Sequence, residues 1–155
     1  MNLKVLWAPW RLEYVEQADE RSGCIFCEPE SELVVDRGPH AFVVLNRFPY
    51  SAGHLLVAPG RHIGVYGELT DEEVLDVHRL ATASIAALDA EYGPHGYNLG
   101  WNLGRSAGAG VVDHVHLHVV PRWTGDTSFM PVVAGAKVIP EALAATADRL
   151  RARLS

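Results

Sequence analysis

The 155-residue sequence has few cysteines and no long hydrophobic run, and each of these absences excludes a class of protein. Its two cysteines, Cys24 and Cys27, lie too close together to staple a small secreted domain. No window of about 20 apolar residues is present, so the sequence predicts no membrane-spanning helix. Residues 1–10 lack the apolar run of a signal peptide. We therefore expect a cytoplasmic protein without a membrane partner.

The sequence also has fewer basic than acidic residues. The 13 lysines and arginines are outnumbered by 19 acidic residues, which gives a formal net charge of −6. Such a protein has no general field to attract nucleic acid, so a phosphate-bearing ligand would need local dipoles and a few cations. Hydrophobic residues make up 48% and charged residues 21%, a globular composition, and the length suits one domain.

The hydrophobic pattern predicts an α+β fold. Short apolar runs bounded by proline or glycine predict four strands, at residues 41–46, 54–58, 97–103 and 115–120. Thr70 followed by Glu73 predicts a capping box, and the apolar stripe behind it predicts a helix that ends at Gly93. A shorter helix is expected from Pro140 to about Leu154, and residues 1–32 look irregular.

Three histidines alternate with apolar residues near the end of the chain. On a strand, His114, His116 and His118 would share one face while the apolar residues between them fill the other. Burying three imidazoles costs free energy unless each finds a hydrogen-bond partner. The alternative to a functional site is a half-exposed strand whose histidines simply face solvent. Two chemistries remain open: a catalytic zinc with three nitrogen ligands, or a neutral imidazole that attacks phosphorus.

A glycine-rich loop, residues 104–110, comes directly before the histidines and favours the phosphorus chemistry. Gly104, Gly108 and Gly110 permit close backbone approach and positive φ, so successive N–H groups could cradle phosphate oxygens. Loops of this kind are also often plain tight turns. Three cations could neutralise a polyphosphate leaving group or remain solvated surface charges: Arg105, Arg122 and Lys137.

The Cys24-x-x-Cys27 spacing is half of a tetrahedral zinc site. A redox-active pair and two buried thiols are the alternatives, although no thioredoxin-like pattern follows. His54, at the start of the second expected strand, is interpreted as a structural residue.

The segment from His114 to Val120 resembles the His-φ-His-φ-His-φ-φ signature of the histidine-triad (HIT) superfamily. Residues 46–59 and 98–104 resemble the family's neighbouring strands, so the resemblance covers about residues 24–123. It implies a mainly antiparallel sheet of about five strands with one long helix and a C-terminal helix. The whole chain, 1–155, would be one HIT domain with an N-terminal segment, 1–32, and a C-terminal extension, 124–155. A homodimer or higher homo-oligomer is usual.

The resemblance also implies roles for individual residues. His116 would attack the α-phosphorus of a nucleotide and form a nucleotidyl-histidine, and His118 would donate to the phosphate oxygens. In cysteine-bearing members two histidines complete a structural Cys₂His₂ zinc site, here His62 and His114, so that His114 would also orient the active strand. The substrate contacts would be Asn46 at the ribose and Asn102, Gly104, Ser106, Gly108 and Gly110 along the phosphate path.

The flanking segments at residues 6–11, 120–126 and 137–140 resemble bacterial diadenosine-tetraphosphate phosphorylase-like members, in which inorganic phosphate replaces water as the acceptor. Many superfamily members carry glutamine four residues before the first histidine, where this chain has Gly110. We therefore expect phosphorolysis of diadenosine tetraphosphate to ADP and ATP. The alternatives are a hydrolase of dinucleoside polyphosphates or nucleoside phosphoramidates, a non-catalytic nucleotide-binding module, and a zinc enzyme with the metal on all three histidines.

Overall fold

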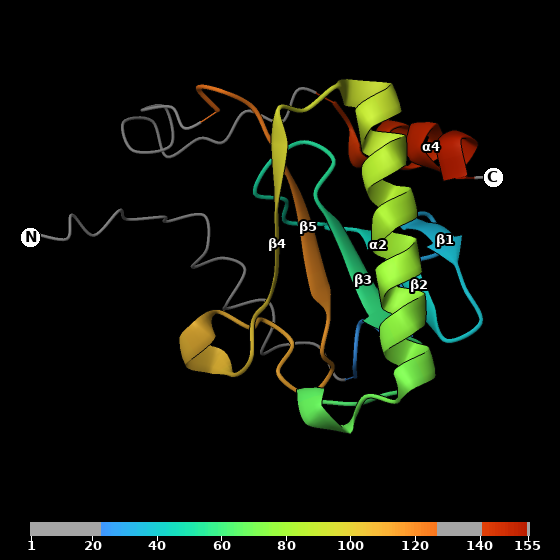
Figure 1. Cartoon of the computed structure of the whole chain (residues 1–155), viewed down its shortest axis with the longest axis vertical. Helices are drawn as coiled ribbons and strands as arrows, with labels where there is room; N and C mark the ends of the chain where they lie inside the picture. The colour runs from blue at the N-terminus through green and yellow to red at the C-terminus, as the bar shows by residue number, and fades with distance from the viewer. Residues whose placement is uncertain (1–22, 127–140, 155) are drawn as a thin grey trace, which may run out of the picture.

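The computed structural model describes residues 23–126 and 141–154. Five strands, two α-helices and two short 3₁₀ helices make up this part of the chain (Figure 1). In chain order they are β1 (Val34–Arg37), β2 (Ala41–Leu45), β3 (Leu55–Pro59), η1 (Tyr66–Glu68), α2 (Asp71–Tyr92), β4 (Gly96–Trp101), η2 (Arg105–Ala107), β5 (Leu117–Arg122) and α4 (Leu143–Leu154).

The strands form one antiparallel sheet in the order β1-β2-β3-β5-β4. Helix α2 lies along one face of this sheet, and α4 packs against α2 and β1 (Figure 1). These features confirm the expected α+β architecture with a sheet of five strands, one long helix and a C-terminal helix. None of the helices in the described ranges is long and apolar enough to cross a membrane.

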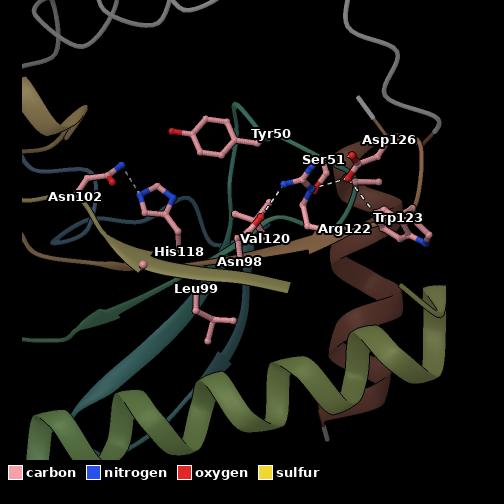
Figure 2. Close-up of a pocket in the computed structure, with 12 residues that line it drawn as sticks. Tyr50, Ser51, Asn98, Leu99, Asn102, His118, Val120, Arg122, Trp123 and Asp126 are labelled. Atoms are coloured by element: carbon pink, nitrogen blue, oxygen red, sulfur yellow. Dashed lines mark hydrogen bonds and ion pairs between the residues drawn. The ribbon is translucent and has the colours of Figure 1, made fainter. Parts of the chain in front are cut away.

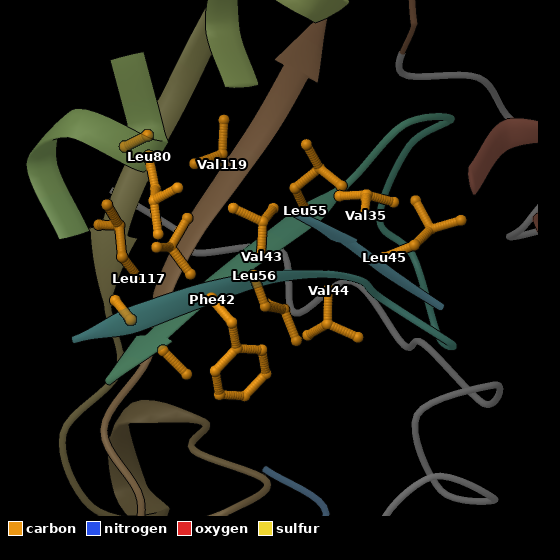
Figure 3. Close-up of a cluster of buried hydrophobic side chains, with 14 of the residues drawn as sticks. Val35, Phe42, Val43, Val44, Leu45, Leu55, Leu56, Leu80, Leu117 and Val119 are labelled. Carbon is orange, nitrogen blue, oxygen red and sulfur yellow. The ribbon is translucent and has the colours of Figure 1, made fainter. Parts of the chain in front are cut away.

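The core lies on both faces of β2 and β3, whose residues are all buried. Val43, Leu55 and Val119 point toward α2, whereas Phe42 and Leu56 point to the opposite side (Figure 3). A strand covered on both faces gives a continuous apolar run instead of an alternating one, as these sequences do. His118 pairs with Leu56 across the ladder, so its side chain belongs to the face opposite α2.

The ends of α2 are set by local signals. The Thr70 side chain accepts from the backbone N–H of Glu73, and the Glu73 carboxylate accepts from the N–H of Thr70. Gly93 ends the helix in the left-handed conformation at φ 54°, which suits glycine because it has no Cβ. The expected capping box and helix end are both confirmed.

The strand boundaries differ from the expected ones at the triad. We expected a strand at residues 115–120, but β5 runs from Leu117 to Arg122 and contains Pro121. The backbone N–H of Val115 instead bonds to the carbonyl of Ile63 at 2.8 Å, so the chain reaches β5 along the segment that follows β3. Because the ladder starts at Leu117, its partner β4 ends at Trp101 and not at residue 103. The expected helix start at residue 140 lies outside the described residues.

Candidate active site and metal cluster

His116 lies on the extended approach to β5 and is 5% exposed. Its ring Nδ1–H donates to the carbonyl oxygen of His114 at 2.9 Å, which leaves the lone pair of the neutral ring on Nε2. Burial lowers the pKa of His116 from its usual value, and the hydrogen bond to His114 opposes that shift only in part. The ring is therefore neutral near pH 7, as a nucleophile must be. The carbonyl that orients it was not identifiable from the sequence.

His118 is oriented by His54, a residue that the sequence led us to interpret as structural. His54 is fully buried, and its Nε2 lies 3.0 Å from Nδ1 of His118. The backbone N–H of Tyr50 donates to His54 Nδ1 at 3.0 Å, so Nδ1 is unprotonated and Nε2 carries the proton. His54 then donates to His118, whose own proton sits on Nε2. The Tyr50 ring stacks on His118 with an interplanar angle of 5°.

The two asparagines expected to contact substrate flank this pair. The Asn46 Nδ2 group lies 3.3 Å from His54 Nδ1, and its Oδ1 accepts from the N–H of Phe48 at 2.9 Å. The Asn102 Nδ2 atom lies 3.4 Å from His118 Nε2 (Figure 2). With the proton of His118 on Nε2, the Asn102 amide accepts it only after a rotation that exchanges the positions of Nδ2 and Oδ1. Both amides therefore lie within reach of the histidines.

The glycine-rich loop forms a compact turn around η2. Gly104 and Gly108 have positive φ, 81° and 88°, which glycine adopts without strain. The N–H groups of Ala107 and Ala109 bond to the carbonyl of Gly104, and that of Gly108 bonds to Arg105. We expected these N–H groups to donate to phosphate, but three of them donate to carbonyl oxygens within the loop. The two flanking positions of the expected cradle are exposed Ser106 and half-buried Gly110.

The structure brings Cys24, Cys27, His62 and His114 together as one cluster, with all four ligand atoms within 4.8 Å of one another. Cys24 Sγ lies 3.3 Å from His114 Nδ1, and Cys27 Sγ lies 3.2 Å from His62 Nδ1 and 3.8 Å from His114 Nδ1. A tetrahedral zinc places sulfur and nitrogen ligands about 3.5 Å apart. The four residues therefore fit a metal ion with two sulfur and two nitrogen ligands.

His114 is held for that role by its other ring nitrogen, because Nε2 donates to the carbonyl of Pro59 at 2.8 Å. This orientation is incompatible with a catalytic zinc on all three triad histidines. His114 Nδ1 faces the cysteines, while His116 Nδ1 is bonded to a backbone carbonyl.

Phe26 connects the cluster to the nucleophile. It lies between the two cysteines in sequence, is 3% exposed, and packs against the rings of His114 and His116 at centroid distances of 5.3 and 4.7 Å. The sequence offered no signal for this contact, since an aromatic residue in a turn is usually explained by packing alone.

Of the three candidate cations, Arg122 is paired with Asp126 and Asn98, and Arg105 is exposed in the loop. Lys137 lies outside the described residues.

Sequence comparison with known proteins identifies relatives of this chain. Residues 28–125 match the family model of the HIT domain. A Mycobacterium tuberculosis protein named AP-4-A phosphorylase is 39% identical over 155 residues, which cover 92% of this chain and 80% of that protein. An adenosine 5'-monophosphoramidase of Schizosaccharomyces pombe is 37% identical over 105 residues, covering 64% of this chain and 74% of that protein.

Solved structures agree with these matches. A zinc-bound histidine triad family protein from Mycobacterium smegmatis superposes with a TM-score of 0.69 at 27% identity, covering 85% of this chain and 93% of that one. From its sequence match and its fold, the chain belongs to the HIT domain family.

Proposed function

We propose that the protein is a nucleotidyl transferase that cleaves dinucleoside polyphosphates through a covalent intermediate on His116. The preferred substrate is diadenosine tetraphosphate and the acceptor is inorganic phosphate, so that the products are ADP and ATP. The observation that carries the proposal is the hydrogen bond from His116 Nδ1 to the His114 carbonyl, which fixes the lone pair on Nε2. Similarity to a protein named AP-4-A phosphorylase supports phosphate as the acceptor.

The residues account for two steps. First, Nε2 of His116 attacks the α-phosphorus, the bond from that phosphorus to the bridging oxygen breaks, and ATP leaves. A phosphate oxygen then attacks the adenylyl-histidine, the phosphorus–nitrogen bond breaks, and ADP leaves with Nε2 restored. The Nε2–H of His118 donates to the phosphoryl oxygens as negative charge builds on them in each step. Asn46 contacts the ribose, and Asn102 with residues 104–110 lines the phosphate path.

Zinc is the metal that we propose for the cluster of Cys24, Cys27, His62 and His114, at one ion per chain. A closed set of two thiolates and two imidazoles gives zinc a structural role, because no coordination position remains for water or substrate. Bound there, the ion supplies a tether between the N-terminal turn and the segment that carries His116.

We also propose that the protein forms a homodimer. Strand β4 is at the edge of the sheet formed by the described residues, and Leu99 and Leu103 near it are 47% and 49% exposed. An uncovered edge with apolar side chains favours association. Light scattering should give twice the chain mass of 16.9 kDa.

The second candidate is a hydrolase in which water resolves the same intermediate. The similarity to an adenosine 5'-monophosphoramidase favours it. Gly110, with no side chain to position a water molecule, favours phosphate instead.

Incubation with diadenosine tetraphosphate, with and without inorganic phosphate, separates the two. ADP plus ATP, formed only with phosphate, supports the proposal. AMP plus ATP in both reactions would make the protein a hydrolase, and no turnover in either would contradict both reactions with this substrate.

A further inference from the structure

A cavity of about 600 Å³ runs along the face of β4 and β5 that lies opposite α2 (Figure 2). His118 and Asn102 lie at one end of it, and Arg122, Trp123 and Asp126 lie at the other. The loop at residues 50–52 forms a wall. The cavity therefore opens directly from the imidazole that contacts the phosphoryl group and extends well past it. Its volume is within the range of sites that hold a ligand the size of a nucleotide.

The cavity surface next to His118 is formed by a glycine, Gly100. Gly100 on β4 pairs with His118 across the ladder, and Asn98 pairs with Val120. An added Cβ at Gly100 would meet no heavy atom within 4 Å, so the missing side chain leaves open space beside His118. A leaving group can therefore pass over Gly100 without displacing any side chain of the described chain.

The length of the cavity points to a large leaving group. His118 and Arg122 are four residues apart on the same face of β5, which places them about 13 Å apart along the strand. A single phosphate or amine would occupy only the end next to His118. A nucleotide joined through its phosphates reaches the other end.

The far end is polar but has little net charge. The guanidinium of Arg122 donates to both Asp126 oxygens, with Nε–Oδ2 and NH2–Oδ1 distances of 2.6 and 2.8 Å. It also donates to Asn98 Oδ1 at 2.7 Å. Three hydrogen bonds hold the planar group in one orientation, and the carboxylate offsets its charge. Such a fixed plane, with the half-buried Trp123 beside it, suits the flat face and polar edges of a nucleobase better than an anionic phosphate chain.

We propose that this cavity binds the leaving nucleotide of a dinucleoside polyphosphate, with the distal nucleobase at the Arg122–Asp126 pair. The inference rests on the proposed function, because it takes His116 as the site of cleavage. It assigns to the enzyme substrates with a nucleoside at both ends, in preference to phosphoramidates, whose leaving amine would leave most of the cavity empty.

Binding measured in a His116→Ala background, which cannot form the covalent intermediate, tests the subsite. Adding Gly100→Val should weaken the binding of diadenosine tetraphosphate by about tenfold or more while AMP binding changes by less than about twofold. Valine suits a strand, and retained AMP binding reports that the fold is intact. Gly67→Val is the control, because Gly67 is exposed, does not line the cavity and would place its added Cβ within 4 Å of no heavy atom, and it should change neither affinity.

A second variant tests the nucleobase assignment. Arg122→Gln should weaken the binding of diadenosine tetraphosphate but not that of adenosine 5'-tetraphosphate, which has no second nucleoside. Equal losses for both ligands would overturn the assignment of a base to this end. Diadenosine tetraphosphate binding that is unchanged in Gly100→Val would overturn the subsite alone. No binding of that ligand by the parent His116→Ala protein would overturn the proposed function together with the subsite.

Discussion

Replacing His54 by asparagine and by glutamine tests the hydrogen-bond chain that orients His118. His54 Nδ1 accepts from the N–H of Tyr50, and Nε2 lies 3.0 Å from His118 Nδ1. Asparagine places its amide near the position of Nδ1, so it keeps an acceptor for Tyr50 but does not reach His118. Glutamine places its amide near Nε2, so it can donate to His118 while losing the bond to Tyr50.

The magnitude follows from what each variant leaves in place. Removing a donor to developing oxyanion charge outright costs about 10²–10³ in kcat. His54→Asn keeps the His118 ring but no longer selects its tautomer, so we expect a smaller loss of about 10–100-fold in kcat/KM, as for other partners that orient a reacting group. His54→Gln should recover most of this loss. Each variant replaces a fully buried ring with a smaller side chain and should lose about 1–3 kcal/mol of unfolding free energy, so stability alone cannot separate them.

The assay combines kcat/KM for diadenosine tetraphosphate with ¹⁵N NMR of the histidine rings. We expect the Nε2–H tautomer of His118 in the wild type and in His54→Gln, and a tautomer mixture in His54→Asn. Equal activity losses in the two variants, with the wild-type tautomer of His118 kept in both, would refute the orienting role and reduce His54 to a space-filling residue.

Four further predictions concern the nucleophile, the metal and the fold. His116→Ala should abolish turnover and His116→Lys should not rescue it, whereas more than a few per cent of residual activity in a clean preparation would contradict the nucleophile. Cys24→Ser should lose the bound zinc, measured by elemental analysis, and melt at a lower temperature, while a metal-free and fully stable wild type would contradict the zinc site. Gly53→Ala should lose about 2–4 kcal/mol of unfolding free energy in urea titrations, because the site has φ +73° and an added Cβ would lie 2.8 Å from Leu88 Cδ2; an unchanged midpoint would refute this cost. The hydrogen bond from Arg61 lowers the pKa of Glu73 below its usual 4.5, so this pair stabilises the fold above about pH 4.5, and its contribution is lost as the pH falls through the folded value. Arg61→Gln should therefore destabilise the protein at pH 7 and match the wild type in strong acid, and a pH-independent difference would contradict the linkage.

Local patterns predicted most of the fold. The capping box at Thr70 and the apolar stripe behind it identify α2, because helix signals are confined to a few neighbouring turns. The local patterns did not predict strand β1. It has four residues, and its register with β2 shifts between Val34 and Asp36, so it lacks the length and regular alternation that identify a strand.

In the candidate site, too, the sequence predicted features formed by neighbouring residues but not contacts between residues far apart in the chain. The triad is visible because its three histidines alternate within five residues. The contact between His54 and His118 joins residues 64 positions apart, and Phe26 meets His116 only after the N-terminal turn packs on the chain before β5. Such contacts depend on how the elements pack, and neither periodicity nor spacing reports them. His62 was predicted as a metal ligand only from the resemblance to a known family. The 35 positions between it and Cys27 form no spacing pattern that would indicate a shared site.

Three polar groups of His114 are engaged at once: Nδ1 in the metal cluster, Nε2 on the Pro59 carbonyl, and the backbone carbonyl on His116. If the cluster holds zinc, as we propose, a molecule without the metal also lacks one restraint on the group that anchors the nucleophile. Purified protein with incomplete metal content would then behave as a mixture of competent and incompetent molecules. Its apparent kcat would scale with zinc content while KM stayed constant, so rates from different preparations would be comparable only per mole of bound zinc.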